Sequence, residues 1–268
     1  MIWAGKAALR GAMSCAIIAI IGGISGPVSA ATSLPQSWNG YKWSRVGSLA
    51  ISVGTNVSAS WMPFVNAATA AWSADQYIDY VVKAGTAASA STCGASYGSV
   101  QICNADYGAT GWVGYTQVWT VNNYIVQATI KLNEYYFSQT RYNTSAYRSL
   151  VACQELGNAL GLEDADRSFT NANLGSCTDY TNDPSGTKGT NGTLANLTPS
   201  KSDFANLDQI YAKVDATQIA ATKPTGTSGN AFMASVPEPR LWGMMLAGFG
   251  LLGSVIRRQR RREALARA

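Results

Sequence analysis

Residues 151–166 read VACQELGNALGLEDAD, and this stretch decides how the rest of the chain is interpreted. It continues a helical pattern that we expect over residues 145–161, because apolar residues recur three or four positions apart at Leu150, Cys153, Leu156 and Leu160. Gly161 is the expected end of the helix, since glycine is common just after the last helical turn. The polar residues between these apolar positions are the candidates for chemistry.

Those polar residues fit part of a zinc-binding frame, HExxHxxGxxH. Gln154 and Asn158 occupy the two histidine positions one turn apart, and Asp164 occupies the third. Glu155 and Gly161 match the frame. Residues four apart share one helix face, so two imidazoles there can bind one zinc ion. The glutamate between them then acts as general base on the metal-bound water.

On this frame the chain from about Trp38 to Asp215 resembles the matrixin-like metzincin metallopeptidases, most closely over residues 125–185. Thr178 lies where the family carries the methionine of its methionine turn. The resemblance implies an α/β (α+β) fold with a twisted mixed sheet and a long active-site-type helix. It also implies an irregular C-terminal subdomain that ends in a helix, here expected at 203–215.

The zinc machinery of that family is largely missing from this sequence. The chain contains no histidine. Gln154 and Asn158 offer neutral amide oxygens, which suit calcium better than zinc, and only Asp164 is a good zinc ligand. We therefore expect no cofactor and a degraded site. The alternative is a bound zinc ion with Glu155 as general base.

Other catalytic arrangements find little support. A serine or cysteine nucleophile has no histidine to act as its base. No spacing singles out a pair of carboxylates of the glycosidase kind. An oxygen-rich metal site is a further alternative, and solvated loop positions are the simpler interpretation of its acidic candidates. Those candidates are Glu155, Glu163, Asp164, Asp166 and Asp179.

The first 30 residues have the pattern of a cleavable signal peptide. Lys6 and Arg10 precede an apolar run, and small residues at 28–30 provide a cleavage site after Ala30. The alternative is a short buried helix, which explains neither the basic flank nor the small residues. Export would also remove Cys15.

The C-terminal end has three parts in a fixed order. A motif at Val236, Pro237, Glu238 and Pro239 comes first, and an uncharged stretch at 241–256 follows. Five arginines lie between 257 and 262. The order resembles a PEP-CTERM sorting signal over 236–268, with a transmembrane segment at 241–256 held by arginines on the cytoplasmic side. That resemblance implies processing by an exosortase-type enzyme. A plain membrane anchor is the alternative.

Charge and cysteines describe what lies between these ends. The chain has a formal charge of +5, but residues 31–235 carry 11 basic and 13 acidic residues, which gives −2. The basic balance thus belongs to targeting segments, and we expect no nucleic-acid partner. Four cysteines suit an oxidising compartment. Of three possible pairings, we expect the most local, Cys93–Cys103 and Cys153–Cys177. Their spacing disfavours a four-cysteine zinc site.

One domain is expected over 31–215, followed by a flexible linker at 216–235 that is rich in threonine, alanine, serine and glycine. Alternation predicts strands at 41–53, 76–83, 100–103, 112–121 and 125–132, and helical spacing adds a helix near 60–73.

These features predict an exported, surface-sorted protein whose matrixin-like domain acts as a non-catalytic or very weakly active binding or scaffold protein of the extracellular matrix. A divergent zinc-dependent endopeptidase is the alternative function, and a pure matrix-binding module is a third. The expected partners are the secretion machinery, the sorting enzyme, the membrane before processing, and an extracellular polysaccharide or protein.

Overall fold

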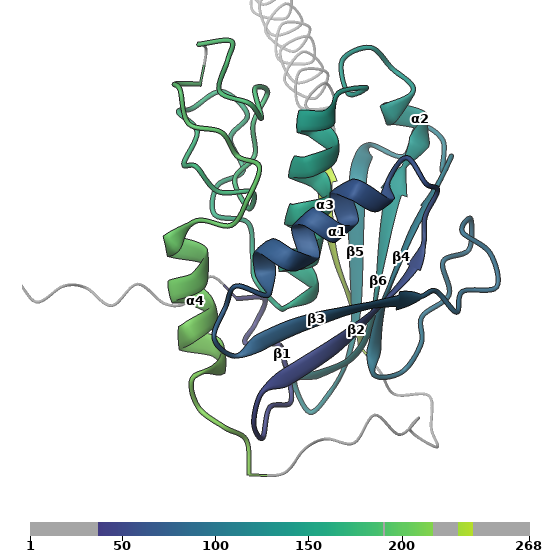
Figure 1. Cartoon of the computed structure of the whole chain (residues 1–268), viewed down its shortest axis with the longest axis vertical. Coiled ribbons are helices and arrows are strands. Elements are labelled where there is room, and N and C mark those ends of the chain that lie inside the picture. Colours follow the sequence, from purple (N-terminus) through teal and green to yellow (C-terminus); the bar gives the residue numbers. More distant parts are fainter. Residues whose placement is uncertain (1–36, 190, 217–229, 238–268) are drawn as a thin grey trace, which may run out of the picture. The chain divides into compact units, whose positions relative to one another are not determined.

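The structure, a computed structural model, describes residues 37–189, 191–216 and 230–237 (Figure 1). Its strands follow the alternating, β-branched segments of the sequence. They are β1 Lys42–Trp43, β2 Leu49–Asn56, β3 Ile78–Ala84, β4 Ser99–Ala105, β5 Trp112–Val121, β6 Tyr124–Asn133 and β7 Asn230–Pro237. The helices are α1 Met62–Trp72, α2 Glu134–Phe137, α3 Ser145–Ala159 and α4 Lys201–Tyr211.

The strands form one mixed sheet in the order β3-β2-β4-β6-β5-β7, and β1 pairs with β6. Strands β3, β2, β4 and β6 run parallel to one another, whereas β5 runs antiparallel to both β6 and β7. Asn122 and Asn123 join β5 to β6 with positive φ angles of 52° and 66°, as a tight hairpin turn requires. The expected α/β fold with a mixed sheet is confirmed.

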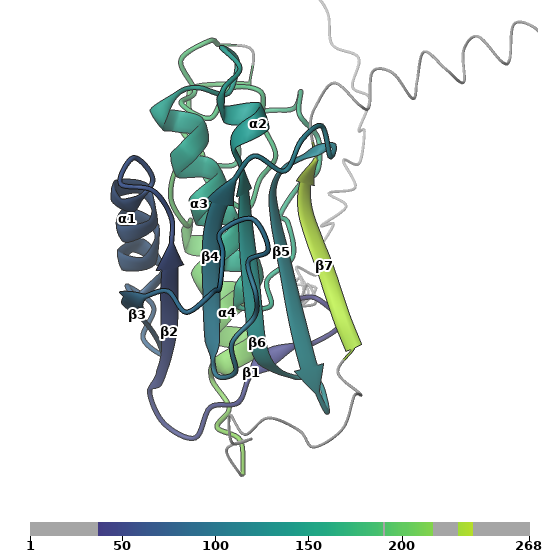
Figure 2. The ribbon, with the colours of Figure 1, turned by 90° about the vertical axis from the view of Figure 1, so that its right-hand side faces the viewer.

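Helices α1 and α3 lie on the same face of the sheet (Figures 1 and 2). Helix α1 has a proline in its first turn, where a missing N–H costs no helical hydrogen bond. Its buried residues Val65, Ala68 and Trp72 share one side, as the spacing predicts. They join alternate apolar residues of β2, β4 and β6 in a single hydrophobic core.

Every residue of α3 from Leu150 to Ala159 is buried, which is unusual for so polar a sequence. Such a helix needs hydrogen-bond partners for its last carbonyl groups, because these have none within the helix. Aromatic side chains supply them. Tyr80 Oη donates to the Leu156 carbonyl at 2.7 Å, Trp43 Nε1 to Ala159 at 2.8 Å, and Tyr211 Oη to Leu160 at 2.7 Å.

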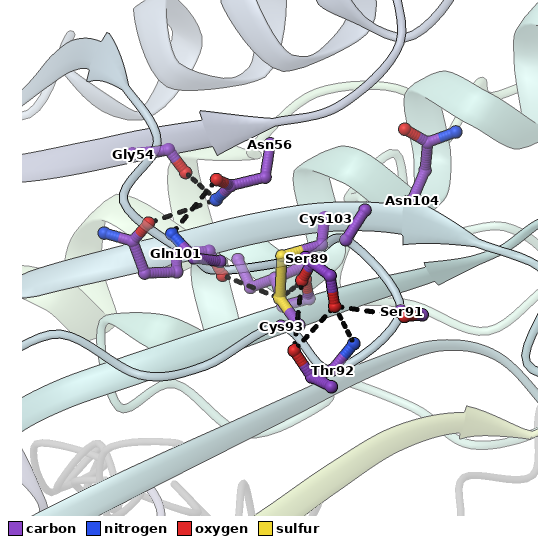
Figure 3. Close-up of a disulfide and its surroundings, with 12 residues drawn as sticks. Gly54, Asn56, Ser89, Ser91, Thr92, Cys93, Gln101, Cys103 and Asn104 are labelled. Atoms are coloured by element: carbon purple, nitrogen blue, oxygen red, sulfur yellow. Dashed lines mark hydrogen bonds between the residues drawn. A yellow bond between two sulfur atoms is a disulfide. The ribbon is translucent and has the colours of Figure 1, made fainter.

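The segment 85–98 crosses the other face of the sheet, where Cys93 forms a disulfide with Cys103 of β4 (Figure 3). Gln101 Oε1 accepts hydrogen bonds from Asn56 Nδ2 at 3.1 Å and from the Thr86 N–H at 2.9 Å. Gly54 makes room for this amide, since a Cβ atom there would lie 2.5 Å from it. The second disulfide, Cys153–Cys177, ties α3 to the following loop. Both expected pairings are confirmed.

Two expectations about strands need correction. The strand expected at 41–53 is two strands, because Trp43 turns toward the end of α3 while β2 pairs with β3 and β4. Residues 230–235 of the expected flexible linker, with Val236 and Pro237 of the expected sorting motif, form β7. A segment without internal glycine or proline can pair there along the open edge of β5.

The expected irregular subdomain lies between α3 and α4. Its described residues contain isolated bridges, including Asp166 with Asp179, but no helix or longer strand. Helix α4 begins two residues before the expected start, with a capping box formed by Ser200 and Asp203.

Among the described residues, no helix is long and apolar enough to cross a bilayer. The predicted signal peptide at 1–30, the predicted transmembrane segment at 241–256, and residues Glu238 and Pro239 of the motif lie outside the described residues.

We expect the Cys153–Cys177 disulfide to stabilise the domain by about 3 kcal/mol, because cross-linking residues this far apart in sequence lowers the conformational entropy of the unfolded chain. Its loop is longer than that of Cys93–Cys103, so its contribution should be the larger of the two. Replacing Cys153 and Cys177 together by alanine should lower the free energy of unfolding by that amount in urea titrations. The matched pair Cys93→Ala and Cys103→Ala should cost slightly less. A larger loss from the second pair would contradict this ranking.

Asp215 gives the fold a pH dependence. Burial alone would raise its pKa, but hydrogen bonds from the Arg45 N–H, Lys42 and Tyr124 outweigh burial and lower it. A carboxyl group with a lowered pKa stabilises the fold above its unfolded pKa and loses that effect as pH falls through the folded pKa. We expect Asp215→Asn to cost about 1–2 kcal/mol of unfolding free energy at pH 7.

In urea titrations this cost should shrink as the pH falls below about 4. Asp79→Asn, at an exposed position of β3, is the control and should have little effect at either pH. A cost that is the same at pH 3 and pH 7 would show that charge is not involved.

Candidate functional site

Helix α3 places Gln154, Glu155 and Asn158 in the interior, each with none of its surface exposed. They lie there because the apolar residues around them, including Leu156 and Leu160, belong to the core. The chain then turns at Gly161, whose φ of +90° a residue with a side chain rarely adopts. This turn brings Asp164 back to α3.

Asp164 is the centre of the site. Its side chain is only 3% exposed. Gln154 Nε2 donates to Asp164 Oδ1 at 3.1 Å, and Arg167 Nε donates to Asp164 Oδ2 at 3.1 Å. The first and third positions of the zinc-binding frame are therefore brought together, and they are joined by a direct hydrogen bond.

Tyr180 completes the surroundings of Asp164. Backbone hydrogen bonds from Ala165 to Thr178 and from Tyr180 to Asp166 hold the two loop segments side by side. Burial raises the pKa of Asp164, and Arg167, Gln154 and the Tyr180 hydroxyl oppose that rise without cancelling it. Burial and the neighbouring carboxylates Asp164 and Glu155 raise the pKa of Tyr180, so its hydroxyl stays protonated and can donate.

Glu155 is held against β5. Its Oε2 atom accepts a hydrogen bond from the Thr116 hydroxyl, which also reaches the Glu155 carbonyl at 3.0 Å. A Cβ atom on Gly114 would lie 2.4 Å from Glu155 Oε1. The carboxyl group therefore packs on the backbone of the strand, and a hydroxyl group is among its hydrogen-bond partners.

Asn158 differs from its neighbours. Its two amide atoms are buried and form no hydrogen bond with any described residue, and the same is true of Gln154 Oε1. Buried polar groups of this kind are uncommon in folded proteins. The position of the second zinc ligand is thus filled by a polar side chain that does not bond to Asp164 or Glu155.

Thr178 has a structural partner of its own. Its hydroxyl donates to Asp203 Oδ1 at 2.8 Å, and Ser176 Oγ donates to Asp203 Oδ2 at 2.6 Å. The position expected under the site therefore anchors the first turn of α4.

The donor set does not suit zinc. Two of its three positions are amides, and the single carboxylate already accepts hydrogen bonds from Gln154 and Arg167. Within the described part of the chain, no three or more histidine, cysteine, aspartate or glutamate residues form a group that could hold a metal.

Three members of this site were missed by sequence reasoning. Thr116 comes from a distant strand, and nothing in its sequence surroundings marks it. Tyr180 is a loop residue two positions after Thr178. Arg167 had a usable signal, because it follows Asp164 by three residues and Glu163 by four.

Comparisons with known proteins complete the description. No protein-family model and no curated protein matches the chain. Among solved structures, it is similar to High choriolytic enzyme 1 (HCE-1), a hatching enzyme zinc-protease from Oryzias latipes (medaka fish). The identity is 11%, the TM-score is 0.36, and the alignment covers 67% of this chain and 99% of that one.

Proposed function

We propose that residues 31–215 form a metzincin-like domain that does not hydrolyse peptides and serves as a binding or scaffold protein outside the cell. The single observation that carries this proposal is the engagement of Asp164 by Gln154 Nε2 and Arg167 Nε, both at 3.1 Å. In a zinc peptidase, a ligand at this position would direct its lone pairs at the metal. In this chain the lone pairs of Asp164 are directed at the Arg167 guanidinium and at the Gln154 amide N–H, which stand where the metal would be.

Arg167 supplies the positive charge that a metal ion would otherwise bring to Asp164. Its side chain is 58% exposed, and it also lies 3.4 Å from Glu163 Oε1. A metal ion bound to Asp164 would have to displace Arg167 or share the carboxylate with it. Two features therefore lower the affinity for zinc: the amide side chains at two ligand positions, and the positive charge of Arg167 beside Asp164.

The position of Glu155 also supports a domain that does not hydrolyse peptides. A general base must face the water that it activates. The Thr116 hydroxyl and the Gly114 backbone hold this carboxylate against β5. A buried carboxyl group needs such hydrogen-bond partners whether or not any reaction occurs.

Export rests on separate observations. Two disulfides are typical of proteins that fold outside the cytoplasm. We propose that the signal peptide at 1–30 directs secretion and that an exosortase-type enzyme processes the PEP-CTERM-like tail at 236–268. The extracellular partner would be a polysaccharide or a protein of the matrix.

We expect the purified protein to carry fewer than about 0.1 zinc ions per chain and to leave casein and gelatin uncleaved, because it lacks three good ligands. Metal analysis and a proteolysis assay test this. A zinc-selective chelator should leave the melting temperature unchanged. About one zinc per chain with chelator-sensitive proteolysis would establish the alternative, a divergent endopeptidase that uses Glu155.

The double substitution Gln154→His and Asn158→His supplies the positive test. It places two imidazoles one turn apart beside Asp164, so zinc binding should rise toward about one ion per chain. The matched control adds Asp164→Asn, which removes the third ligand and should weaken binding at least about tenfold. Equal binding by both variants would show that Asp164 does not occupy a ligand position.

The tail generates its own prediction. If 236–268 is a processing signal, the mature surface protein should end within or just before residues 236–239. Intact mass measurement of the protein released from cells would show this. Recovery of peptides from the arginines at 257–262 in the mature form would indicate a plain anchor.

A further inference from the structure

The irregular segment between Leu162 and Ser200 contains a second polar cluster that the zinc-binding frame does not include. A segment this long without regular structure is uncommon inside a domain and is often functional. Its centre is the bridge between Asp166 and Asp179. Several asparagine and aspartate residues lie around this bridge, and some of their side-chain oxygen atoms accept no hydrogen bond from the described residues.

Asp179 is completely buried. Its Oδ2 atom accepts hydrogen bonds from the Leu174 N–H at 2.9 Å and from Asn196 Nδ2 at 2.7 Å. Its Oδ1 atom is also buried and accepts none from the described residues. A half-satisfied buried carboxylate is costly, because a charge without partners loses its hydration.

Two neighbouring asparagines leave oxygen atoms in the same condition. Asn173 Nδ2 donates to the carbonyl oxygens of Asp183 and Leu194, at 2.8 and 2.7 Å. Asn171 Nδ2 donates to Asp166 Oδ2 at 2.9 Å. These acceptors fix the orientation of both amides, since only the nitrogen can face them. Each Oδ1 atom is buried and has no hydrogen-bond partner in the described part of the chain.

All three unpartnered atoms are oxygens, which distinguishes this cluster from Asn158, where a donor and an acceptor are both unpartnered. Burial raises the pKa of Asp179, and the nearby Asp166 and Asp203 raise it further. The salt bridges of the described residues involve Asp215, Glu163 and Asp164, but neither Asp166 nor Asp179. The cluster thus combines negative charge with oxygen acceptors and has no cationic side chain bonded to it.

We propose that Asp179, Asn171 and Asn173 bind a calcium ion, with Asp166 as the second carboxylate. Carboxylate and amide oxygens are the ligands that calcium prefers, and main-chain carbonyls and water commonly fill its other positions. Two carboxylates with two amides would give the modest affinity of extracellular calcium modules, with Kd about 0.1–1 mM. The site does not depend on the proposed function, because it shares no ligand with the zinc-binding frame.

The test compares the melting temperature of the full-length protein, purified in detergent, in EGTA and in about 5 mM calcium chloride. An ion that binds only the folded state stabilises it, so we expect a rise of roughly 3–8 °C. Isothermal titration with calcium chloride should show about one site per chain. An equal rise in sodium chloride of the same ionic strength would overturn the proposal, as would the absence of binding heat.

Asp179→Asn keeps the shape of the side chain and removes its charge. In EGTA this variant should stay folded, because its amide oxygen can still accept from Leu174 and Asn196. Calcium should no longer raise its melting temperature. Asp79→Asn, an exposed carboxylate on β3, should keep the full calcium effect. A calcium effect that survives in Asp179→Asn would refute the assignment.

A second variant covers the case in which Asp179→Asn does not fold. Asn171→Asp replaces a neutral ligand by a charged one, and it should raise calcium affinity roughly tenfold while weakening the calcium-free form. Titration calorimetry measures the affinity directly. Unchanged or weaker binding in this variant would place the calcium elsewhere or exclude it.

Discussion

The burial of the second half of α3 is the constraint on which the rest of the structure depends. A buried helix must find hydrogen-bond donors for its last carbonyl groups, and this one finds them in side chains from distant elements. Trp43, Tyr80 and Tyr211 donate from β1, β3 and α4. Burial raises the pKa of both tyrosines, so their hydroxyls remain donors. The same bonds that complete the helix therefore hold the sheet and the last helix in place.

This constraint explains which parts of the fold could be predicted. The periodicity of α1 and α3 and the alternation in β5 and β6 are local signals, and their elements lie where expected. The break between β1 and β2 is not a local signal, because it depends on where the Trp43 indole finds its acceptor. Strand β7 likewise depends on the open edge of β5. At the site, the sequence spacing predicted that Gln154 and Asp164 would lie close together, but it gave no sign of Thr116, which lies on β5.

At the site, two positions of the zinc-binding frame, Gln154 and Asp164, are joined by a hydrogen bond. Asp164 is nearly fully buried, and a buried carboxylate needs positive charge or several donors. In a metal site the ion supplies that charge. In this chain Arg167, Gln154 and Tyr180 share the task. The buried carboxyl group of Asp164 therefore obtains its hydrogen bonds from side chains of this chain, among them the partly exposed Arg167.

The irregular segment beyond Gly161 poses the same problem on a larger scale. It contains no helix or longer strand among its described residues, so scattered backbone hydrogen bonds, side chains and a cross-link hold it in place. Cys153–Cys177 fixes it to α3, Thr178 and Ser176 fix it to the start of α4, and Asn173 joins two of its carbonyl groups. The hydrogen bonds among these ties use donors, and the Oδ1 atoms of Asn171, Asn173 and Asp179 are left without a hydrogen bond from the described residues. An excess of buried oxygen atoms over donors is what a cation would balance, and the calcium site proposed for this loop follows from that imbalance.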